Sequence, residues 1–388
     1  MVSRTLFALV VMVLCVPTAA TAQASHFRFT EPPGSYPVGL RVVDQFDASR
    51  PFAKGHTRAL QTLVWYPALP NASRPMTVDD YVHLTLSELR SDPAAAGDPK
   101  PELFTKWMSR LGSSLTEPLR SARDVPAALG RFPVVIYAAS DSAVSWENAD
   151  LCEYLASQGY VVIASPSMGA NTRDMTDDVP GIEAQARDIS FLITYAKTLP
   201  DADVSEVAVV GFSWGGISNL FAAARDQRID ALVALDGSMR YFPGLVKQAG
   251  YVHPEQMTIP LLFFTEGEIT LEQIASNLSA PENVGPSVLN AWKRGDLLTV
   301  NMLPMAHQQF SSMLERRPTH DVEDEKPGYA WEEGGAGYAW VARYTLWFLD
   351  AHLKHDAASL ARLKAAPVTN RVPSHVMGSQ YRAANATP

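Results

Sequence analysis

The pattern of hydrophobic and polar residues divides the chain into an early pair of strands and a later region in which strands alternate with helices. Residues 39–44 and 57–65 are predicted to form two antiparallel strands, the second alternating and ending at Tyr66-Pro67. From Phe132 onward the apolar runs are continuous, which is typical of parallel strands covered on both faces. These strands are predicted at residues 132–138, 160–165, 206–210, 231–235, 259–265 and 297–302.

Helices are predicted between and after these strands, at residues 147–158, 181–199, 217–224 and 338–354. In the second of them, Ile182, Ala186 and Ile189 recur at helical spacing and mark one apolar face. Strand–helix alternation of this kind predicts an α/β fold with a mostly parallel sheet and helices on both faces. Residues 366–388 show no periodicity, and we predict a poorly ordered tail there.

Residues 76–128 interrupt this rhythm before the strand at 132–138. The segment contains prolines at positions 93, 99, 101 and 118, and helices are predicted within it at residues 79–89 and 102–111. An insertion of this length often covers a pocket, and it can equally elaborate the surface without contacting substrate. Both interpretations stay open at this stage.

The first 22 residues have the pattern of a signal peptide. Arg4 precedes an apolar run over residues 6–16, and Ala20-Thr21-Ala22 offers a small-residue cleavage site. The apolar run is too short for a membrane-spanning helix. We therefore expect an exported protein, periplasmic or secreted, in which residues 25–365 form a single domain.

Composition narrows the function classes. The formal net charge is −9 and the pI is near 5.5, which argues against binding nucleic acid because phosphates require a basic surface. No later apolar stretch is long enough to span a membrane, so no integral membrane segment is expected in the mature chain. Cleavage would leave Cys152 as the one cysteine, expected to be a buried residue of a helix, and no metal-ligand spacing is present. We expect no metal and no organic cofactor.

The strongest chemical motif is Gly211-Phe212-Ser213-Trp214-Gly215-Gly216. It lies between the predicted strand at 206–210 and the predicted helix at 217–224, the setting of a nucleophile elbow. Small residues let the chain turn tightly there, so that Ser213 is exposed above a helix N-terminus. The sequence predicts that Ser213 is a catalytic nucleophile, against the alternative of a purely structural turn.

A serine hydroxyl needs a base and an acid that orients the base. Among nine histidines, His307 directly follows the last predicted strand, where a catalytic histidine is expected, whereas His253 precedes a strand and His320 lies among charged residues. For the acid, Asp236 ends the strand at 231–235 and is followed by Gly237, a position also typical of a simple turn. Glu266 and Glu268 end the next strand and remain alternatives.

These motifs carry a family resemblance. The stretches 211–216, 234–237 and 307–310 resemble platelet-activating-factor acetylhydrolase and its bacterial relatives, close to the dienelactone-hydrolase group. The resemblance extends over roughly residues 36–355 and implies an α/β-hydrolase fold. It also implies a triad of Ser213, Asp236 and His307, which raises Asp236 above Glu268.

The same resemblance implies an oxyanion hole made by the backbone N–H groups of Trp214 and Asp141. Relatives carry a His-Gly or Pro-Gly pair before the second donor, whereas this chain has Ala139-Ser140-Asp141. Loss of the glycine restricts this loop, and a carboxylate near a forming oxyanion is repulsive unless its side chain points away.

The expected function is therefore an exported serine hydrolase that cleaves small-molecule carboxylic esters with short acyl or acetyl groups. A peptidase or amidase is one alternative, because the same triad serves other acyl transfers. A binding protein that has lost turnover is another, motivated by the altered oxyanion loop.

Overall fold

The computed structural model describes residues 27–52, 56–88, 101–267, 288–320 and 326–385. The expected signal peptide lies outside these residues. Within them, the chain forms a ten-stranded sheet in the order β10-β9-β8-β7-β6-β4-β5-β2-β1-β3. Its strands are β1 (Val38–Phe52), β2 (His56–Pro67), β3 (Ser121–Arg123), β4 (Phe132–Ala138), β5 (Val161–Ser165), β6 (Ala202–Phe212), β7 (Ala231–Leu235), β8 (Leu261–Glu266), β9 (Leu297–Met302) and β10 (Met377–Arg382).

The centre of the sheet is parallel and its two flanks are antiparallel. Strands β4 to β9 pair in parallel with one another, whereas β2 pairs antiparallel with β1 and β5, and β10 pairs antiparallel with β9. The six strands predicted from Phe132 onward are the six parallel ones. The carboxyl ends of β6, β7, β8 and β9 therefore meet at one edge of the sheet, and the predicted site residues follow these strand ends.

Apolar side chains of the central strands alternate between two cores, one on each face of the sheet. In β4, Val135 and Tyr137 belong to the core that includes α3 (Ala149–Ser157) and α10 (Trp331–Leu353). Val134 and Ile136 belong to the opposite core, with α4 (Val179–Ala196) and α5 (Gly215–Ala223). The expected α/β-hydrolase fold, with a mostly parallel sheet covered on both faces, is confirmed.

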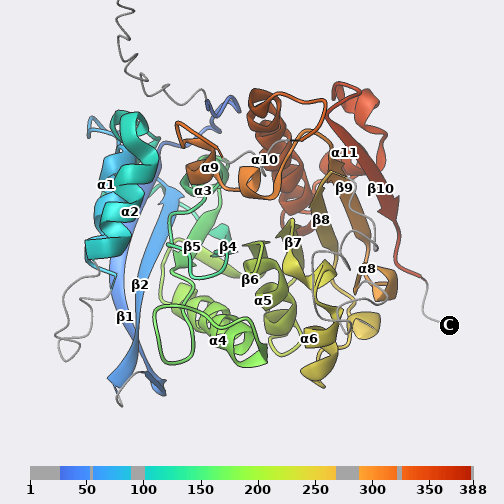
Figure 1. Cartoon of the computed structure of the whole chain (residues 1–388), viewed down its shortest axis with the longest axis horizontal. Coiled ribbons are helices and arrows are strands. Elements are labelled where there is room, and N and C mark those ends of the chain that lie inside the picture. The colour runs from blue at the N-terminus through green and yellow to red at the C-terminus, as the bar shows by residue number, and fades with distance from the viewer. Residues whose placement is uncertain (1–26, 53–55, 89–100, 268–287, 321–325, 386–388) are drawn as a thin grey trace, which may run out of the picture.

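The remaining helices are short and lie around this framework (Figure 1). They are α1 (Val78–Val82), α2 (Pro101–Leu111), α6 (Pro243–Gln248), α8 (Val288–Ala291), α9 (Ser312–Glu315) and α11 (Ala357–Lys364), with 3-10 turns η2 (His83–Leu86), η3 (Gly112–Thr116), η4 (Ser238–Arg240), η5 (Pro254–Gln256), η7 (His307–Phe310) and η9 (Pro367–Asn370).

The described parts of the insertion, residues 76–88 and 101–128, pack beside β1 and β2 at one edge of the sheet (Figure 1). Its first predicted helix is interrupted, because α1 ends at Val82 and continues as the 3-10 turn η2. Trp107 of α2 packs on Trp146 with ring centroids 5.0 Å apart, and the Tyr81 hydroxyl donates to Glu153 of α3. Buried aromatic residues of the insertion therefore pack against the main core and form hydrogen bonds with it.

The prediction of a poorly ordered tail is wrong for residues 377–382. They form β10, which pairs with β9 over its whole length, and Tyr381 donates a hydrogen bond to Asp296. Met377 is buried at the start of the strand. A segment of six residues gains its strand conformation from pairing with an edge strand rather than from its own pattern, so periodicity alone did not reveal it.

Strand β1 continues to Phe52, beyond its predicted end at residue 44, because its outer end is polar, whereas β2 has nearly its predicted bounds. Arg58 of β2 is 1% exposed and forms an ion pair with Asp188 of α4 at 2.5 Å. Arg50 of β1 binds the same carboxylate through its Nη2 at 2.6 Å, and its Nε binds Asp47. The guanidinium groups and carboxylates pair with one another, so this polar strand end is buried without leaving an unpaired charge.

Candidate active site

Ser213 occupies a tight turn between β6 and α5. Its φ of +52° is in the left-handed region that residues with a side chain rarely adopt. The turn is held because the Ser213 N–H donates to the Leu235 carbonyl at 3.1 Å, and the Ser213 carbonyl accepts from the Ser238 N–H at 2.8 Å. Backbone hydrogen bonds to the next strand and its loop thus hold the serine in this conformation.

The glycines of the motif are required by close approach. A Cβ on Gly215 would lie 2.1 Å from the Ala138 carbonyl oxygen, and one on Gly216 would lie 2.5 Å from the Cα of Gly237. Both neighbours are backbone atoms, which cannot rotate away as a side chain can. The turn therefore packs directly against the ends of β4 and β7.

His307 begins the 3-10 turn η7, five residues after β9 ends at Met302. Its Nε2 lies 2.9 Å from the Ser213 Oγ. Its backbone N–H donates to Glu266 Oε2 at 2.9 Å, and Lys326 Nζ lies 2.8 Å from the same oxygen. The ring is 39% exposed, so it can reach both the serine and solvent.

Asp236 follows β7 and is 1% exposed, with a φ of +43°. One carboxylate oxygen, Oδ2, lies 2.5 Å from His307 Nδ1. The other, Oδ1, accepts the Tyr241 hydroxyl at 2.6 Å and the Glu266 N–H at 3.3 Å. Every donor that faces this carboxylate is satisfied, which fixes its plane and hence the direction in which it presents Oδ2 to the imidazole.

The two groups shift each other's pKa in opposite directions. Burial alone would raise the pKa of Asp236, but the hydrogen bond and charge of His307 outweigh it and lower that pKa below the ordinary value. Burial would lower the pKa of His307, and the hydrogen bond and charge of Asp236 outweigh it, so that pKa is raised. The pair therefore favours an ionised carboxylate that stabilises a protonated imidazole.

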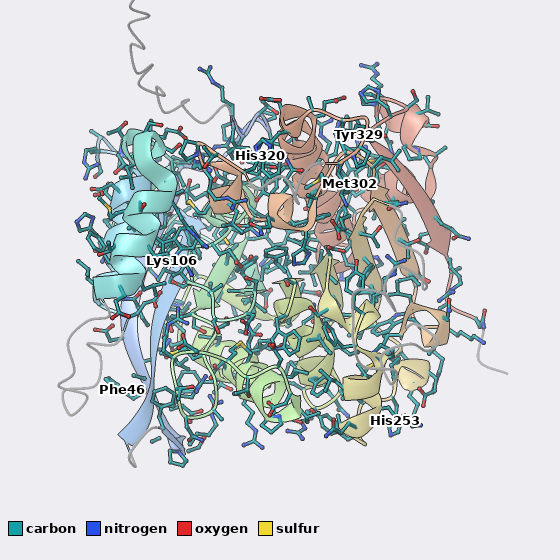
Figure 2. The ribbon with its side chains drawn as sticks, viewed as in Figure 1. Phe46, Lys106, His253, Met302, His320 and Tyr329 are labelled. Carbon is teal, nitrogen blue, oxygen red and sulfur yellow. The ribbon has the colours of Figure 1, made fainter. Side chains whose placement is uncertain are left out.

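The structure brings Ser213, Asp236 and His307 into one hydrogen-bonded chain. Glu266, an alternative acid at the end of β8, contacts the backbone of His307 rather than its ring. Glu268 lies outside the described residues. Figure 2 shows His253 far from Met302, at the end of β9 that leads to the His307 turn.

Two supporting residues were not anticipated from the sequence. Tyr241 and Lys326 orient the triad through Asp236 and Glu266 respectively. Tyr241 is only five residues beyond Asp236, so its position in the sequence could have indicated a contact with that carboxylate. Lys326 is distant in sequence from Glu266, and nothing in the sequence indicated their contact. Both act through other residues rather than on Ser213.

The loop after β4, residues 139–141, is fixed by buried polar side chains. The Ser140 N–H donates to Glu147 Oε2 at 2.9 Å and its hydroxyl donates to the other Glu147 oxygen. The Ser167 hydroxyl donates to the Ser140 carbonyl, and Gln185 Nε2 donates to the Ala139 carbonyl at 2.7 Å. These contacts hold the loop in one conformation without a glycine.

The two expected oxyanion donors belong to the residues that directly follow Ser213 and Ser140. Trp214 is the N-cap of α5, and Asp141 follows Ser140 directly. Among the residues that the structure describes, neither the Trp214 N–H nor the Asp141 N–H has a backbone acceptor. The Asp141 side chain is exposed, with its Oδ1 accepting from the Ser142 hydroxyl at 3.3 Å.

The insertion also reaches this loop. Glu88, at its described end, forms a buried ion pair with Arg173 at 3.1 Å. Arg173 donates to the carbonyls of Ser142 and Ala143 at 3.1 and 3.0 Å. Residues before the main fold therefore contribute to the order of the loop beside the serine.

Other chemistry is not evident in the part of the chain that the structure describes. No group of three or more His, Cys, Asp and Glu side chains is arranged to hold a metal ion. No described helix is both long and apolar enough to cross a membrane. Cys152 is buried in α3, and burial raises the pKa of its thiol well above the ordinary value.

Comparison with protein families finds a match to the dienelactone hydrolase family over residues 123–268, less than half of the chain. The matched region contains Ser213 and Asp236, and it ends before His307. Two curated relatives, both provisionally assigned as carboxymethylenebutenolidases, match shorter stretches. One, from Synechocystis, is 31% identical over 106 residues, which is 24% of this chain and 43% of the relative. The other, from Methylorubrum extorquens, is 27% identical over 130 residues, which is 30% of this chain and 44% of the relative.

The chain thus spans less than half the length of these curated relatives. A solved structure covers far more: a ferulic acid esterase from Streptomyces cinnamoneus aligns with 91% of this chain and 98% of its own, with a TM-score of 0.61 and 19% sequence identity. At that identity the similarity establishes the fold. The family match adds that residues 123–268 are similar in sequence to dienelactone hydrolases.

Proposed function

We propose that this dienelactone-hydrolase-like α/β-hydrolase is a serine hydrolase that cleaves carboxylic esters with short acyl groups through an acyl-enzyme. The observation that carries the proposal is the continuous chain from Ser213 Oγ to His307 Nε2 at 2.9 Å and from His307 Nδ1 to Asp236 Oδ2 at 2.5 Å. The match to the dienelactone hydrolase family supports hydrolysis in general. The serine mechanism and the class of ester are what we propose beyond that match.

In the first half-reaction, Ser213 Oγ attacks the ester carbonyl carbon while His307 Nε2 takes the hydroxyl proton. The tetrahedral intermediate collapses, the C–O bond to the alcohol breaks, and His307 returns its proton to the leaving oxygen. Water then attacks the acyl-enzyme with His307 again as the base. The acid is released and Ser213 regains its proton.

Asp236 holds the proton of His307 on Nδ1, which leaves Nε2 free to accept the serine proton. Its charge stabilises the imidazolium that forms, in keeping with the raised pKa of His307. The carbonyl oxygen would gain negative charge beside the N-terminus of α5, where the Trp214 N–H is one donor and the Asp141 N–H the other. Glu147 would orient the second donor through Ser140.

The test compares the full chain with Ser213→Ala and His307→Ala on p-nitrophenyl acetate and butyrate. We expect turnover by the wild type and a fall of about 10³–10⁶-fold in kcat for each variant. A fluorophosphonate probe should label the wild type and not Ser213→Ala. Wild-type turnover no greater than that of both variants would refute esterase activity, and labelling without ester turnover would favour an amide substrate or a binding role.

We also propose that the chain is exported, as residues 1–22 suggest. Fractionation of cells that express the full chain should find the protein in the periplasm or medium, shortened at its N-terminus to near Gln23. Retention of the intact N-terminus in the cytoplasm would contradict this.

A further inference from the structure

A cavity of about 470 Å³ lies outside the triad, between α10 and the segment that leads into β1. None of Ser213, Asp236 and His307 lines it. Its volume falls within the range of about 300–1,000 Å³ typical of small-molecule sites. A smaller cavity of about 300 Å³ adjoins it and shares the stacked rings of His320 and Trp331, whose centroids are 4.3 Å apart.

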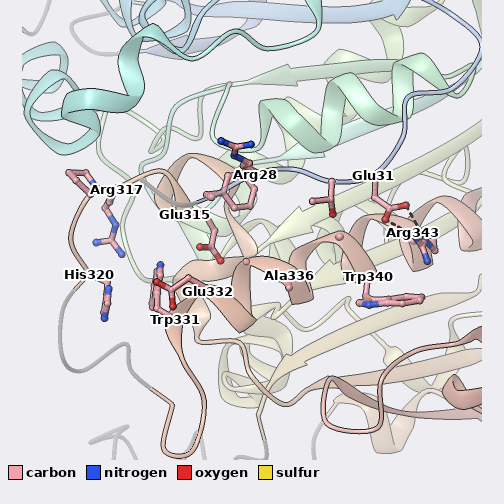
Figure 3. A pocket seen from close by; sticks show the side chains of 15 residues that line it. Arg28, Glu31, Glu315, Arg317, His320, Trp331, Glu332, Ala336, Trp340 and Arg343 are labelled. Atoms are coloured by element: carbon pink, nitrogen blue, oxygen red, sulfur yellow. Dashed lines mark hydrogen bonds and ion pairs between the residues drawn. The ribbon is translucent and has the colours of Figure 1, made fainter. Parts of the chain in front are cut away.

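One wall of the larger cavity carries an unsatisfied buried group. Glu315 is only 3% exposed, and its Oε1 has no hydrogen-bond partner among the described residues. Its carboxyl group is also bonded by the Gln309 side chain, so it is held in place. Figure 3 shows this carboxyl group directed between Arg28 and the Trp331 and Glu332 side chains. A buried oxygen without a partner is costly, and a ligand donor would remove that cost.

Ionisable groups of both signs line the cavity. Three arginines and three glutamates line it, and one pair, Arg343 with Glu31, is already joined at 2.7 Å. Planar groups complete the wall, with Trp340 beneath the Arg343 guanidinium at 4.3 Å. Burial raises the pKa of Glu315 well above its ordinary value, so a ligand group beside it must be able to bond a neutral as well as an ionised carboxyl group. Other groups of the ligand must accept hydrogen bonds from the guanidinium groups.

We propose that this cavity binds a neutral polyhydroxylated ligand, a sugar, with one hydroxyl hydrogen-bonded to Glu315 Oε1 and others accepting from Arg28. Hydroxyl groups donate and accept at once, which matches the mixed lining. The apolar face of a sugar ring suits the rings of Phe27 and the tryptophans.

The site is joined to the catalytic loop through Gln309. The side chain of Gln309 accepts from the Ala306 N–H at 2.9 Å and donates to the Trp331 carbonyl at 3.0 Å. Ala306 immediately precedes His307. The proposal nevertheless stands apart from the proposed esterase activity, because it requires binding alone.

The experiment is a calorimetric titration of the full chain with xylobiose and cellobiose. We expect millimolar or tighter binding, weakened at least about tenfold by Glu315→Leu and by Arg28→Ala. Arg28 is exposed, so its variant should fold even if Glu315→Leu does not. Glu255→Gln, an exposed carboxylate outside the cavity, is the matched control and should bind as the wild type does.

Glucuronate and glucosamine serve as charged comparisons and should bind more weakly than the neutral sugars. Absence of heat with both neutral disaccharides, or binding that neither cavity variant weakens, would overturn the proposal. Stronger binding of a charged sugar than of both neutral ones would also overturn it, since the cavity would then select for charge.

Discussion

Replacing Asp236 by Asn tests whether the carboxylate sets the tautomer of His307. In the native site Oδ1 faces two donors, the Tyr241 hydroxyl and the Glu266 N–H, while Oδ2 faces His307 Nδ1. An asparagine has one acceptor oxygen. Because two donors point at the Oδ1 position, the amide oxygen should settle there and turn its NH₂ toward His307.

That orientation places a donor against Nδ1, so the imidazole must carry its proton on Nε2. A protonated Nε2 cannot accept the proton of Ser213, and the charge that stabilises the imidazolium is also lost. The expected fall in kcat/KM is about 10⁴-fold, or roughly 5 kcal/mol of transition-state stabilisation. Folding should change little, since all three contacts keep a partner.

The assay is kcat/KM on p-nitrophenyl acetate at pH 8, with the thermal midpoint measured alongside. Glu266→Gln is the matched control, because it keeps the backbone donor to position 236 and an acceptor for the His307 N–H; we expect a loss of less than about tenfold. A loss below tenfold for Asp236→Asn, together with a severe loss for Glu266→Gln, would refute the assignment of Asp236 as the acid.

Four further outcomes follow from the site. The raised pKa of His307 predicts that kcat/KM falls on acidification with a midpoint above pH 6.5, since only the neutral ring accepts the serine proton; a midpoint below 6.5 would contradict this. Glu147→Gln should lower kcat about 10- to 100-fold with little change in KM, by loosening Ser140 beside the oxyanion loop; unchanged kcat would refute the role. Gly215→Ala should destabilise the fold by about 1–3 kcal/mol in urea unfolding, because its Cβ meets backbone, and native-like stability would show that the turn can shift. Cys152 should resist thiol reagents until the protein unfolds, and rapid labelling of the native state would contradict its burial.

Much of the architecture was predictable from local pattern. Continuous apolar runs marked the six parallel strands, because burial on both faces leaves no polar side to alternate with. Ser213 was marked by its glycines, whose absence of a side chain is a property of the residues themselves. His307 followed from its place just after a predicted strand, since parallel strands end at a common edge. Position left Asp236 as one of three candidate acids, and the family resemblance raised it above Glu268.

Other features depended on contacts between distant segments. Strand β10 exists because β9 offers an unpaired edge, and the extended end of β1 is held where Arg50 meets Asp47 and Asp188 of α4. The support of His307 by Lys326 through Glu266 likewise joins residues from separate loops.

The sequence by itself determined the sheet core and the identity of the candidate nucleophile, because side-chain periodicity and the glycine requirement are local. Only the tertiary structure decided which carboxylate meets the imidazole ring and how the loop at residues 139–141 is held without a glycine. Asp236 and Glu266 both lie at the ends of strands. Asp236 contacts the ring of His307 and Glu266 contacts its backbone, each at a distance of under 3 Å. Such distances are set by packing of whole elements, which no local pattern records.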